Sequence, residues 1–256
     1  MKFGYQLFSA LSLCQTKEGM ISIMEKLSQL GYDGVEFFSY AGIPAEEMKT
    51  LLERLHLKGF NSHVQLERWE KDPEGEVRYA AQAGIPCLTI PWLPPEMRNA
   101  EGYAKIKAMI PKLLSLCEKY GITLLYHNHH FEFDKTPEGR YVLEDILGVD
   151  PALGLELDTF WAHYAGIDPV AYMESQKARM KLIHIKDYLT LDGGPVAGGL
   201  EMPTFCAIGT GKMNNQPIVD WAKANDIAWV CVEQDNSHIP ELEAAALSIR
   251  ALKAMA

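Results

Sequence analysis

Six β-prone segments of the chain end in side chains that can carry charge or bind metal. In chain order these residues are Glu36; His63; His127, His129 and Glu132; Glu156 and Asp158; His184, Lys186 and Asp187; and Glu233 and Asp235. Charged and imidazole side chains are poor choices for the end of a buried strand unless a partner compensates them. Packing alone does not explain this pattern, which therefore indicates a chemical site.

Four of these residues have the chemistry of a site for one divalent metal ion. They are Glu132, Asp158, His184 and Glu233, and they follow four consecutive segments. Three carboxylates and one imidazole suit Mn²⁺, Mg²⁺ or Co²⁺ better than a structural zinc ion, which favours cysteine and histidine. We therefore expect one divalent ion, Mn²⁺ first, with Mg²⁺, Co²⁺ or Zn²⁺ as alternatives.

These side chains must be positioned by eight short β-prone runs that alternate with helical segments. The runs are Lys2–Ser9, Gly34–Phe38, Gly59–Gln65, Pro86–Trp92, Thr123–His129, Leu153–Phe160, Lys181–Tyr188 and Trp229–Asp235. Between them, apolar residues recur three and four positions apart, as in amphipathic helices. Strands alternating with helices indicate βαβ crossovers and a parallel sheet. Eight such units in 256 residues predict the α/β class and a single (β/α)8 TIM barrel, with its active site at the C-terminal ends of the strands.

No linker or composition shift divides the chain, so we expect residues 1–256 to form a single TIM-barrel domain. The Gly/Pro-rich segment Asp192–Pro203 is expected to be a loop over the barrel mouth. The segment Gly209–Lys212 resembles a phosphate-binding loop but lacks the full Walker pattern. We expect it to close over the mouth, where Lys212 would meet a phosphate if the substrate carries one.

Composition excludes several classes of protein. A formal net charge of −10 argues against a general nucleic-acid binder, which needs a basic surface. The chain has no apolar stretch long enough to span a membrane. Its five cysteines are scattered without a CxxC pair, which is typical of a reduced protein. We expect a cytoplasmic protein whose partner is a small molecule rather than nucleic acid or a membrane, and paired barrels are common enough to make a homo-oligomer an open alternative.

The order and spacing of six motifs resemble the xylose isomerase-like TIM-barrel superfamily. The motifs are Tyr32–Phe38, Tyr126–Phe133, Leu155–Pro169, His184–Tyr188, Ile208–Met213 and Val230–Asp235. That superfamily holds sugar isomerases, epimerases, inosose dehydratases and endonuclease IV-type enzymes. The resemblance covers essentially the whole chain and implies a Glu-Asp-His-Glu site for one divalent ion. Asp158, His184 and Glu233 carry over directly from the matching motifs.

The fourth ligand departs from the superfamily pattern. Many relatives place a Glu inside the fifth strand, where this chain has His127. We expect Glu132 to be the ligand, with His127 or His129 in contact with the substrate. In the alternative arrangement His127 is the ligand and Glu132 contacts the substrate. Trp161 stands where epimerases of the superfamily often carry a histidine, so the resemblance does not specify an epimerase mechanism.

The resulting hypothesis is a metal-dependent isomerase or epimerase that acts on a sugar or sugar derivative. A bound divalent ion polarises a carbonyl, and a carboxylate then removes the neighbouring proton to give an enediolate. We expect Glu132 and Glu233 to be the acid/base pair and Lys186 to stabilise the developing oxyanion. The residues expected to bind the sugar are Glu36, His63, His127, His129 and Trp161, with Trp92 or Phe38 as further apolar contacts.

Three other functions remain open on the sequence alone. A lyase on the same scaffold, either an inosose-type dehydratase or an enzyme that processes 3-keto-sugars or their glycosides, is favoured by the sequence Tyr126-His127-Asn128-His129. Endonuclease IV-type DNA repair would require further His and Glu ligands and a basic face. A non-catalytic sugar-binding barrel would bind the metal without turnover.

Overall fold

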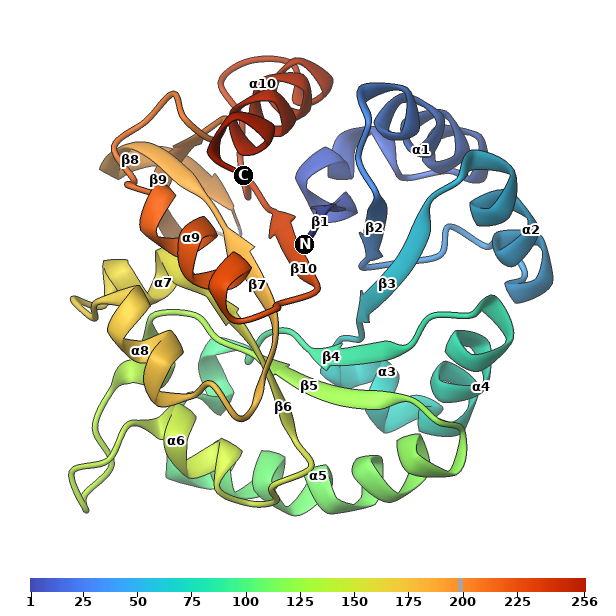
Figure 1. Cartoon of the computed structure of the whole chain (residues 1–256). Helices are drawn as coiled ribbons and strands as arrows, with labels where there is room; N and C mark the ends of the chain where they lie inside the picture. The colour runs from blue at the N-terminus through green and yellow to red at the C-terminus, as the bar shows by residue number, and fades with distance from the viewer. Residues whose placement is uncertain (198–199) are drawn as a thin grey trace.

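The computed structural model describes residues 1–197 and 200–256, with side chains described outside 193–201. Eight parallel strands close into a barrel in the order β1-β10-β7-β6-β5-β4-β3-β2, surrounded by helices (Figure 1). The barrel strands are β1 (Lys2–Gln6), β2 (Gly34–Phe37), β3 (Lys58–His63), β4 (Cys87–Ile90), β5 (Thr123–His127), β6 (Gly154–Asp158), β7 (Met180–Ile185) and β10 (Trp229–Val232). This arrangement confirms the predicted TIM barrel, whereas the extent of the domain stays a prediction.

The helices connect successive strands around the outside of the barrel. They are α1 (Lys17–Leu30), α2 (Ala45–Leu55), α3 (Leu66–Lys71), α4 (Pro73–Ala83), α5 (Ala100–Lys119), α6 (Val142–Leu147), α7 (Thr159–Tyr164), α8 (Pro169–Ser175), α9 (Gln216–Ala224) and α10 (Glu241–Met255), with the 3-10 turns η1 (Leu7–Leu13), η2 (Pro95–Met97) and η3 (Phe131–Phe133). Helices α1 and α4 end at Gly31 and Gly84, whose φ angles of 87° and 76° favour glycine. None of the described helices is both long and apolar enough to cross a lipid bilayer.

The base of the barrel interior is filled by apolar side chains. Phe60, Leu125, Leu182 and Cys231 form a separate buried cluster inside the ring of strands. Gly4 on β1 completes this layer, because a Cβ atom at this position would lie 2.3 Å from the ring of Phe60. The cluster closes the bottom of the barrel and leaves the opposite end for polar groups.

Polar side chains occupy the next inward positions on the same strands. Since side chains alternate between the two faces of a strand, a residue two positions after an inward one also points inward. Starting from the apolar base, the inward residues run from Leu125 to His127, from Gly154 to Glu156 and Asp158, from Leu182 to His184 and Lys186, and from Cys231 to Glu233 and Asp235. The strands thus change from apolar to ionisable along their own length.

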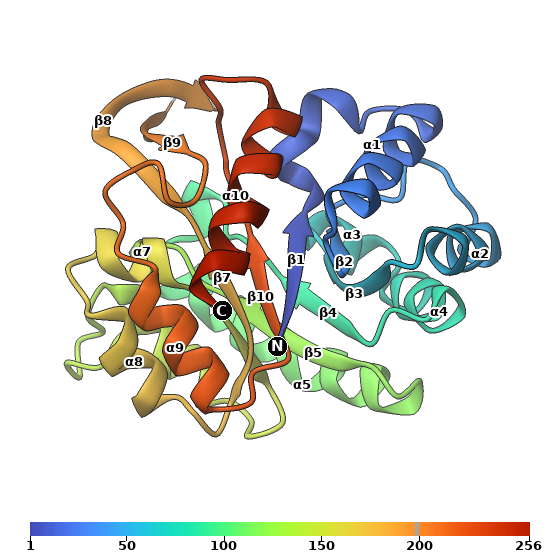
Figure 2. The ribbon, with the colours of Figure 1, turned by 45° about the horizontal axis from the view of Figure 1, so that its top comes forward.

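The segment Asp192–Pro203, predicted to be a loop, belongs largely to an antiparallel hairpin. Strands β8 (Asp187–Ala197) and β9 (Leu200–Cys206) pair with several register shifts, and residues 198–199 lie outside the described chain. In Figure 2 the arrow of β1 points toward the end of the barrel at which this hairpin lies. The hairpin therefore stands at the C-terminal ends of the barrel strands.

The glycine-rich loop after β9 encloses a carboxylate of the protein itself. Asp187 Oδ2 accepts hydrogen bonds from the amides of Gly209 and Gly211, at 2.9 Å and 3.0 Å, and Oδ1 accepts from the amides of Tyr188 and Met213, both at 2.9 Å. A ring of backbone N–H groups is a favourable anion site. The resemblance of Gly209–Lys212 to a phosphate-binding loop is thus explained by an internal anion. Lys212 does not line the cavity described below.

Candidate active site

A cavity of about 570 Å³ opens at the C-terminal end of the barrel. Its lining combines imidazoles and carboxylates with a large apolar and aromatic share. The residues are Phe8, Phe38, His63, Gln65, Pro91, Trp92, Arg98, His127, His129, His130, Phe131, Trp161, Tyr164, Met202, Pro203, Glu233 and Asp235. The cavity is large enough for a sugar-sized ligand.

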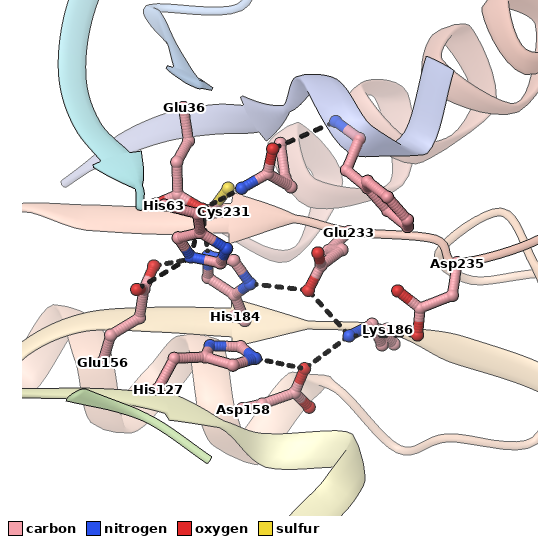
Figure 3. Close-up of polar contacts among 12 residues, drawn as sticks. Glu36, His63, His127, Glu156, Asp158, His184, Lys186, Cys231, Glu233 and Asp235 are labelled. Carbon is pink, nitrogen blue, oxygen red and sulfur yellow. Dashed lines mark hydrogen bonds and ion pairs between the residues drawn. The ribbon is translucent and has the colours of Figure 1, made fainter. Parts of the chain in front are cut away.

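Four buried side chains converge at the floor of this cavity (Figure 3). His127, Asp158, His184 and Glu233 each place one nitrogen or oxygen atom within 4.8 Å of the corresponding atoms of the others. His184 Nδ1 lies 2.9 Å from Glu233 Oε2, and His127 Nε2 lies 3.9 Å from Asp158 Oδ2. We call these four residues the cation group. They come from the ends of β5, β6, β7 and β10.

The ammonium of Lys186 is buried among three carboxylates beside the cation group. Its Nζ lies 2.6 Å from Asp158 Oδ2, 2.7 Å from Glu233 Oε2 and 3.3 Å from Asp235 Oδ2. Burial alone would lower the pKa of Lys186, but these carboxylates raise it well above its ordinary value. Lys186 is therefore a buried cation whose charge is shared among the three surrounding carboxyl groups.

Deeper in the barrel, two buried glutamates bracket two imidazoles. His184 Nε2 lies 2.8 Å from Glu36 Oε1 and 2.6 Å from Glu156 Oε1. His63 Nε2 lies 3.0 Å from Glu36 and 3.1 Å from Glu156. Burial alone would lower the pKa of His63, but the two carboxylates raise it to about 10. His63 is therefore a cation that balances part of this negative charge.

This deeper layer orients His184 toward the cation group. A histidine that binds metal through one nitrogen usually donates its other N–H to a carboxylate. With Nε2 facing Glu36 and Glu156, His184 presents Nδ1 to the side of Glu233. The positions of the two glutamates thus select which nitrogen of His184 faces the cavity floor.

The donors of the cation group fit a divalent metal. Burial holds the pKa of His127 well below its ordinary value, so this imidazole is neutral and keeps a lone pair. Burial alone would lower the pKa of His184, but Glu36 and Glu156 raise it, so His184 would release a proton on binding a metal. Its buried Nδ1 has no hydrogen-bond partner among the described residues. Two imidazoles and two carboxylates suit Mn²⁺, Co²⁺ or Zn²⁺. The residues present therefore fit the type of ion expected from the sequence.

Glu132, predicted as a ligand and as a catalytic base, lies apart from the cation group. It is fully buried in η3, where Oε1 accepts from the Tyr126 hydroxyl at 2.9 Å and Oε2 from the His129 amide at 2.8 Å. It is not among the described residues that line the cavity. The turn after β5 folds the Glu132 side chain back onto its own backbone, and His127, the alternative ligand, lies in the cation group.

The other predicted site residues fall into two sets. His63, His127, His129 and Trp161 line the cavity, as a role in substrate binding requires. Glu36 does not reach it, because its side chain is fully buried and accepts from Asn61 Nδ2 at 2.8 Å and from Gln6. Glu36 is thus placed to orient histidines rather than to contact a substrate.

Two residues of the site, Glu156 and Asp235, were not assigned a role from the sequence. Glu156 lies two positions before Asp158, and Asp235 lies two positions after Glu233. The period-two alternation of a strand was the signal that could have identified both as inward-facing. Burial raises the pKa of Asp235 to about 7, against the attraction of Lys186.

The family of the protein follows from its sequence once this barrel and site are considered. The sequence model of the xylose isomerase-like TIM barrel family matches residues 24–255. The chain belongs to this family. No curated protein sequence matches the chain.

Solved structures with the xylose isomerase-like fold superpose on nearly the whole chain. A sugar phosphate isomerase/epimerase from Parabacteroides distasonis ATCC 8503 is 25% identical, with a TM-score of 0.78 over 99% of this chain and 94% of that chain. The IOLI protein with a bound zinc atom is 14% identical, with a TM-score of 0.72 over 100% and 98% of the two chains. The probable 3-DHS dehydratase AsbF from Bacillus anthracis is 15% identical, with a TM-score of 0.73 over 99% of each. Isomerases, epimerases and a dehydratase thus share this architecture.

Proposed function

We propose that this protein is a divalent-metal-dependent isomerase or epimerase that transfers a proton on a sugar or sugar derivative. The observation that carries the proposal is the cation group, which combines two imidazoles and two carboxylates at the floor of a sugar-sized cavity. The similarity to an isomerase/epimerase and to a zinc-binding barrel supports it. We assign His127, not Glu132, as the fourth ligand beside Asp158, His184 and Glu233. Mn²⁺ is the first candidate ion.

The chain supplies a base, a counter-charge and contacts to the substrate. A divalent ion bound here would polarise a substrate carbonyl and acidify the adjacent C–H. Glu233 would hold the ion through one carboxylate oxygen and accept that proton on the other, with Lys186 Nζ 2.7 Å from its Oε2. Lys186 would keep this carboxylate ionised rather than meet the enediolate oxygen, because three carboxylates already surround its ammonium and it does not line the cavity. His63 and His129 would bind substrate hydroxyls, and Trp161 would pack against the sugar ring.

The carboxylates that reach the cavity favour proton transfer on one face of the substrate. Glu233 and Asp235 both follow β10, so both approach from the same side. A single base can move a proton between neighbouring carbons, which is isomerisation. Epimerisation requires delivery of a proton from the opposite face, and Glu233 and Asp235 are the only carboxylates among the described lining residues.

A lyase is the second candidate, supported by the carboxyl group of Asp235 beside Glu233. Elimination requires a base for the C–H and an acid for the departing hydroxyl. Asp235 lines the cavity two residues from Glu233 and would supply that acid. The similarity to a probable dehydratase is consistent with this alternative.

The test combines metal analysis with a substrate panel. The protein is loaded with Mn²⁺ and incubated in D₂O with ketoses, keto-sugars and inososes. Deuterium in an isomeric product supports the isomerase, and a new ultraviolet absorbance from an enone supports the lyase. Asp158→Asn is expected to lose the bound ion and to reduce turnover roughly 100-fold or more. Turnover that survives complete loss of the ion would contradict the proposal, and Asp192→Asn in the hairpin is the matched control.

A further inference from the structure

We propose that Arg98 forms an anion-binding subsite in the cavity, so that the substrate carries a phosphate or carboxylate group. This inference deepens the proposed function, and it rests on that proposal in treating the cavity as the substrate site. Its basis is a guanidinium that lies in the cavity wall, is fixed in position and has no carboxylate partner among the described residues.

The side chain of Arg98 is held in place by aromatic rings and one hydrogen bond. Its Cζ lies 3.9 Å from the centre of the Phe131 ring and 5.2 Å from that of Trp92. Its Nε donates to the carbonyl of Leu93 at 2.9 Å. Stacking and this bond fix the plane of the guanidinium, and neither Nη group has a hydrogen-bond partner among the described residues. This geometry suits the binding of planar oxyanions.

A comparison with Arg68 shows that stacking on an aromatic ring does not by itself leave the Nη groups of an arginine without a partner. Arg68 also stacks on an aromatic ring, with its Cζ 5.1 Å from the centre of Tyr40. The Nη2 of Arg68, however, forms an ion pair with Glu76. Arg98 forms no ion pair with any described residue. The nearby buried carboxylate, Glu132, accepts instead from Tyr126 and His129. The charge of Arg98 is therefore available to a ligand.

The distribution of charge in the cavity directs an anionic group to Arg98. At the floor, Lys186 is already surrounded by Asp158, Glu233 and Asp235, so its charge is not free for an anionic group of the substrate. Among the described lining residues, Arg98 is the only arginine or lysine. A substrate with one anionic end would thus be oriented with that end at Arg98 and its reacting carbons at the cation group.

The remainder of this wall is compatible with such a ligand. His129 stacks on Phe131 with ring centres 5.7 Å apart, and His130 lies 5.3 Å from Trp161. The Nδ1 atoms of both histidines and the indole nitrogen of Trp161 have no hydrogen-bond partner among the described residues. Aromatic surface interspersed with unused polar atoms suits a polar ligand with an apolar ring face.

The experiment measures binding with three probes that share a six-carbon frame: fructose, fructose 6-phosphate and glucuronate. Calorimetric titration of the metal-loaded protein is expected to show at least one anionic probe binding roughly 10-fold to 100-fold more tightly than fructose, because hydrogen bonds to charged groups are the stronger ones. The identity of the preferred anion distinguishes phosphate from carboxylate. Arg98→Met is expected to abolish the preference, so that the anionic probes bind no more tightly than fructose, and Arg98→Lys is expected to retain part of it.

The controls separate this inference from the proposed function. Arg78→Met, on an exposed position of α4, is expected to change nothing. Asp158→Asn is expected to lose the bound metal and the enzymatic turnover but to keep the tighter binding of the anionic probe. The metal site and the anion subsite can therefore be contradicted independently of each other. Equal binding of all three probes, no binding of any of them, or an equal loss for all three in Arg98→Met would overturn the subsite.

Discussion

At the scale of single residues, Glu132 is a buried carboxyl group that is hydrogen-bonded within its own segment of the chain. Its two oxygens accept from Tyr126 and from the His129 amide, and it has no exposed surface. Burial raises its pKa from the ordinary 4.5 to about 7. The folded protein therefore prefers the protonated form of this side chain.

This preference predicts a pH-dependent stability. Because the folded-state pKa is the higher one, the stabilisation is complete below the unfolded pKa of 4.5 and is lost as the pH rises through about 7. This shift in the pKa of Glu132 corresponds to about 3 kcal/mol in the free energy of unfolding. Glu132→Gln imitates the protonated carboxyl, so the free energy of unfolding of the native protein should fall by about 3 kcal/mol relative to this variant between about pH 4.5 and 8. Denaturant titrations measure the difference.

The matched control for this prediction is Glu138→Gln, an exposed position in the same connecting segment. The difference in free energy of unfolding between Glu138→Gln and the native protein should stay constant over the same pH range. If the difference in free energy of unfolding between Glu132→Gln and the native protein also stays constant with pH, then Glu132 is ionised in the folded state and the prediction is wrong.

At the scale of elements, the barrel strands could be predicted from the sequence, but the β8–β9 hairpin and the turn η3 could not. Strands buried on both faces appear as apolar runs, so all eight were predicted. The β8–β9 hairpin was not, because turn-forming residues interrupt its pattern and its ladder has register shifts. The periodic pattern of the strands also could not decide whether His127 or Glu132 is the metal ligand. β5 ends at His127, and the direction of Glu132 depends on the turn η3, which strand periodicity does not describe.

The hairpin and the loop after it depend on one buried carboxylate. Asp187→Asn leaves only one oxygen to accept the four amide hydrogen bonds, so the free energy of unfolding should fall by roughly 3 kcal/mol. Hydrogen exchange at the amides of Gly209, Gly211 and Met213 should accelerate. Asp192→Asn, exposed in the same hairpin, should change stability by less than about 0.5 kcal/mol. Unchanged exchange in Asp187→Asn would contradict this role.

At the scale of the whole molecule, the cation group joins four strands of a closed barrel. Its members follow β5, β6, β7 and β10, which are separated by up to about a hundred residues of chain. A ligand that binds only the folded arrangement stabilises the entire fold by mass action. The assignment of ligands can therefore be tested by unfolding, without knowledge of the substrate.

We predict that Mn²⁺ at about 100 times its Kd raises the free energy of unfolding by about 2.7 kcal/mol. This corresponds to a rise in Tm of roughly 5 to 10 °C, which EDTA should reverse. His127→Ala should abolish the rise, and Glu132→Gln should retain it. The opposite result would restore Glu132 as the ligand.

The position of His184 has a consequence for how this protein can change over evolution. Its ring contacts Glu36 and Glu156 on one side and Glu233 on the other, so side chains from β2, β6 and the end of β10 meet at one imidazole of β7. Replacement of any one partner alters the proton arrangement that the others experience. Positions 36, 156 and 184 should therefore be inherited together as a single trait, and a lineage that loses one of them should replace the others as well.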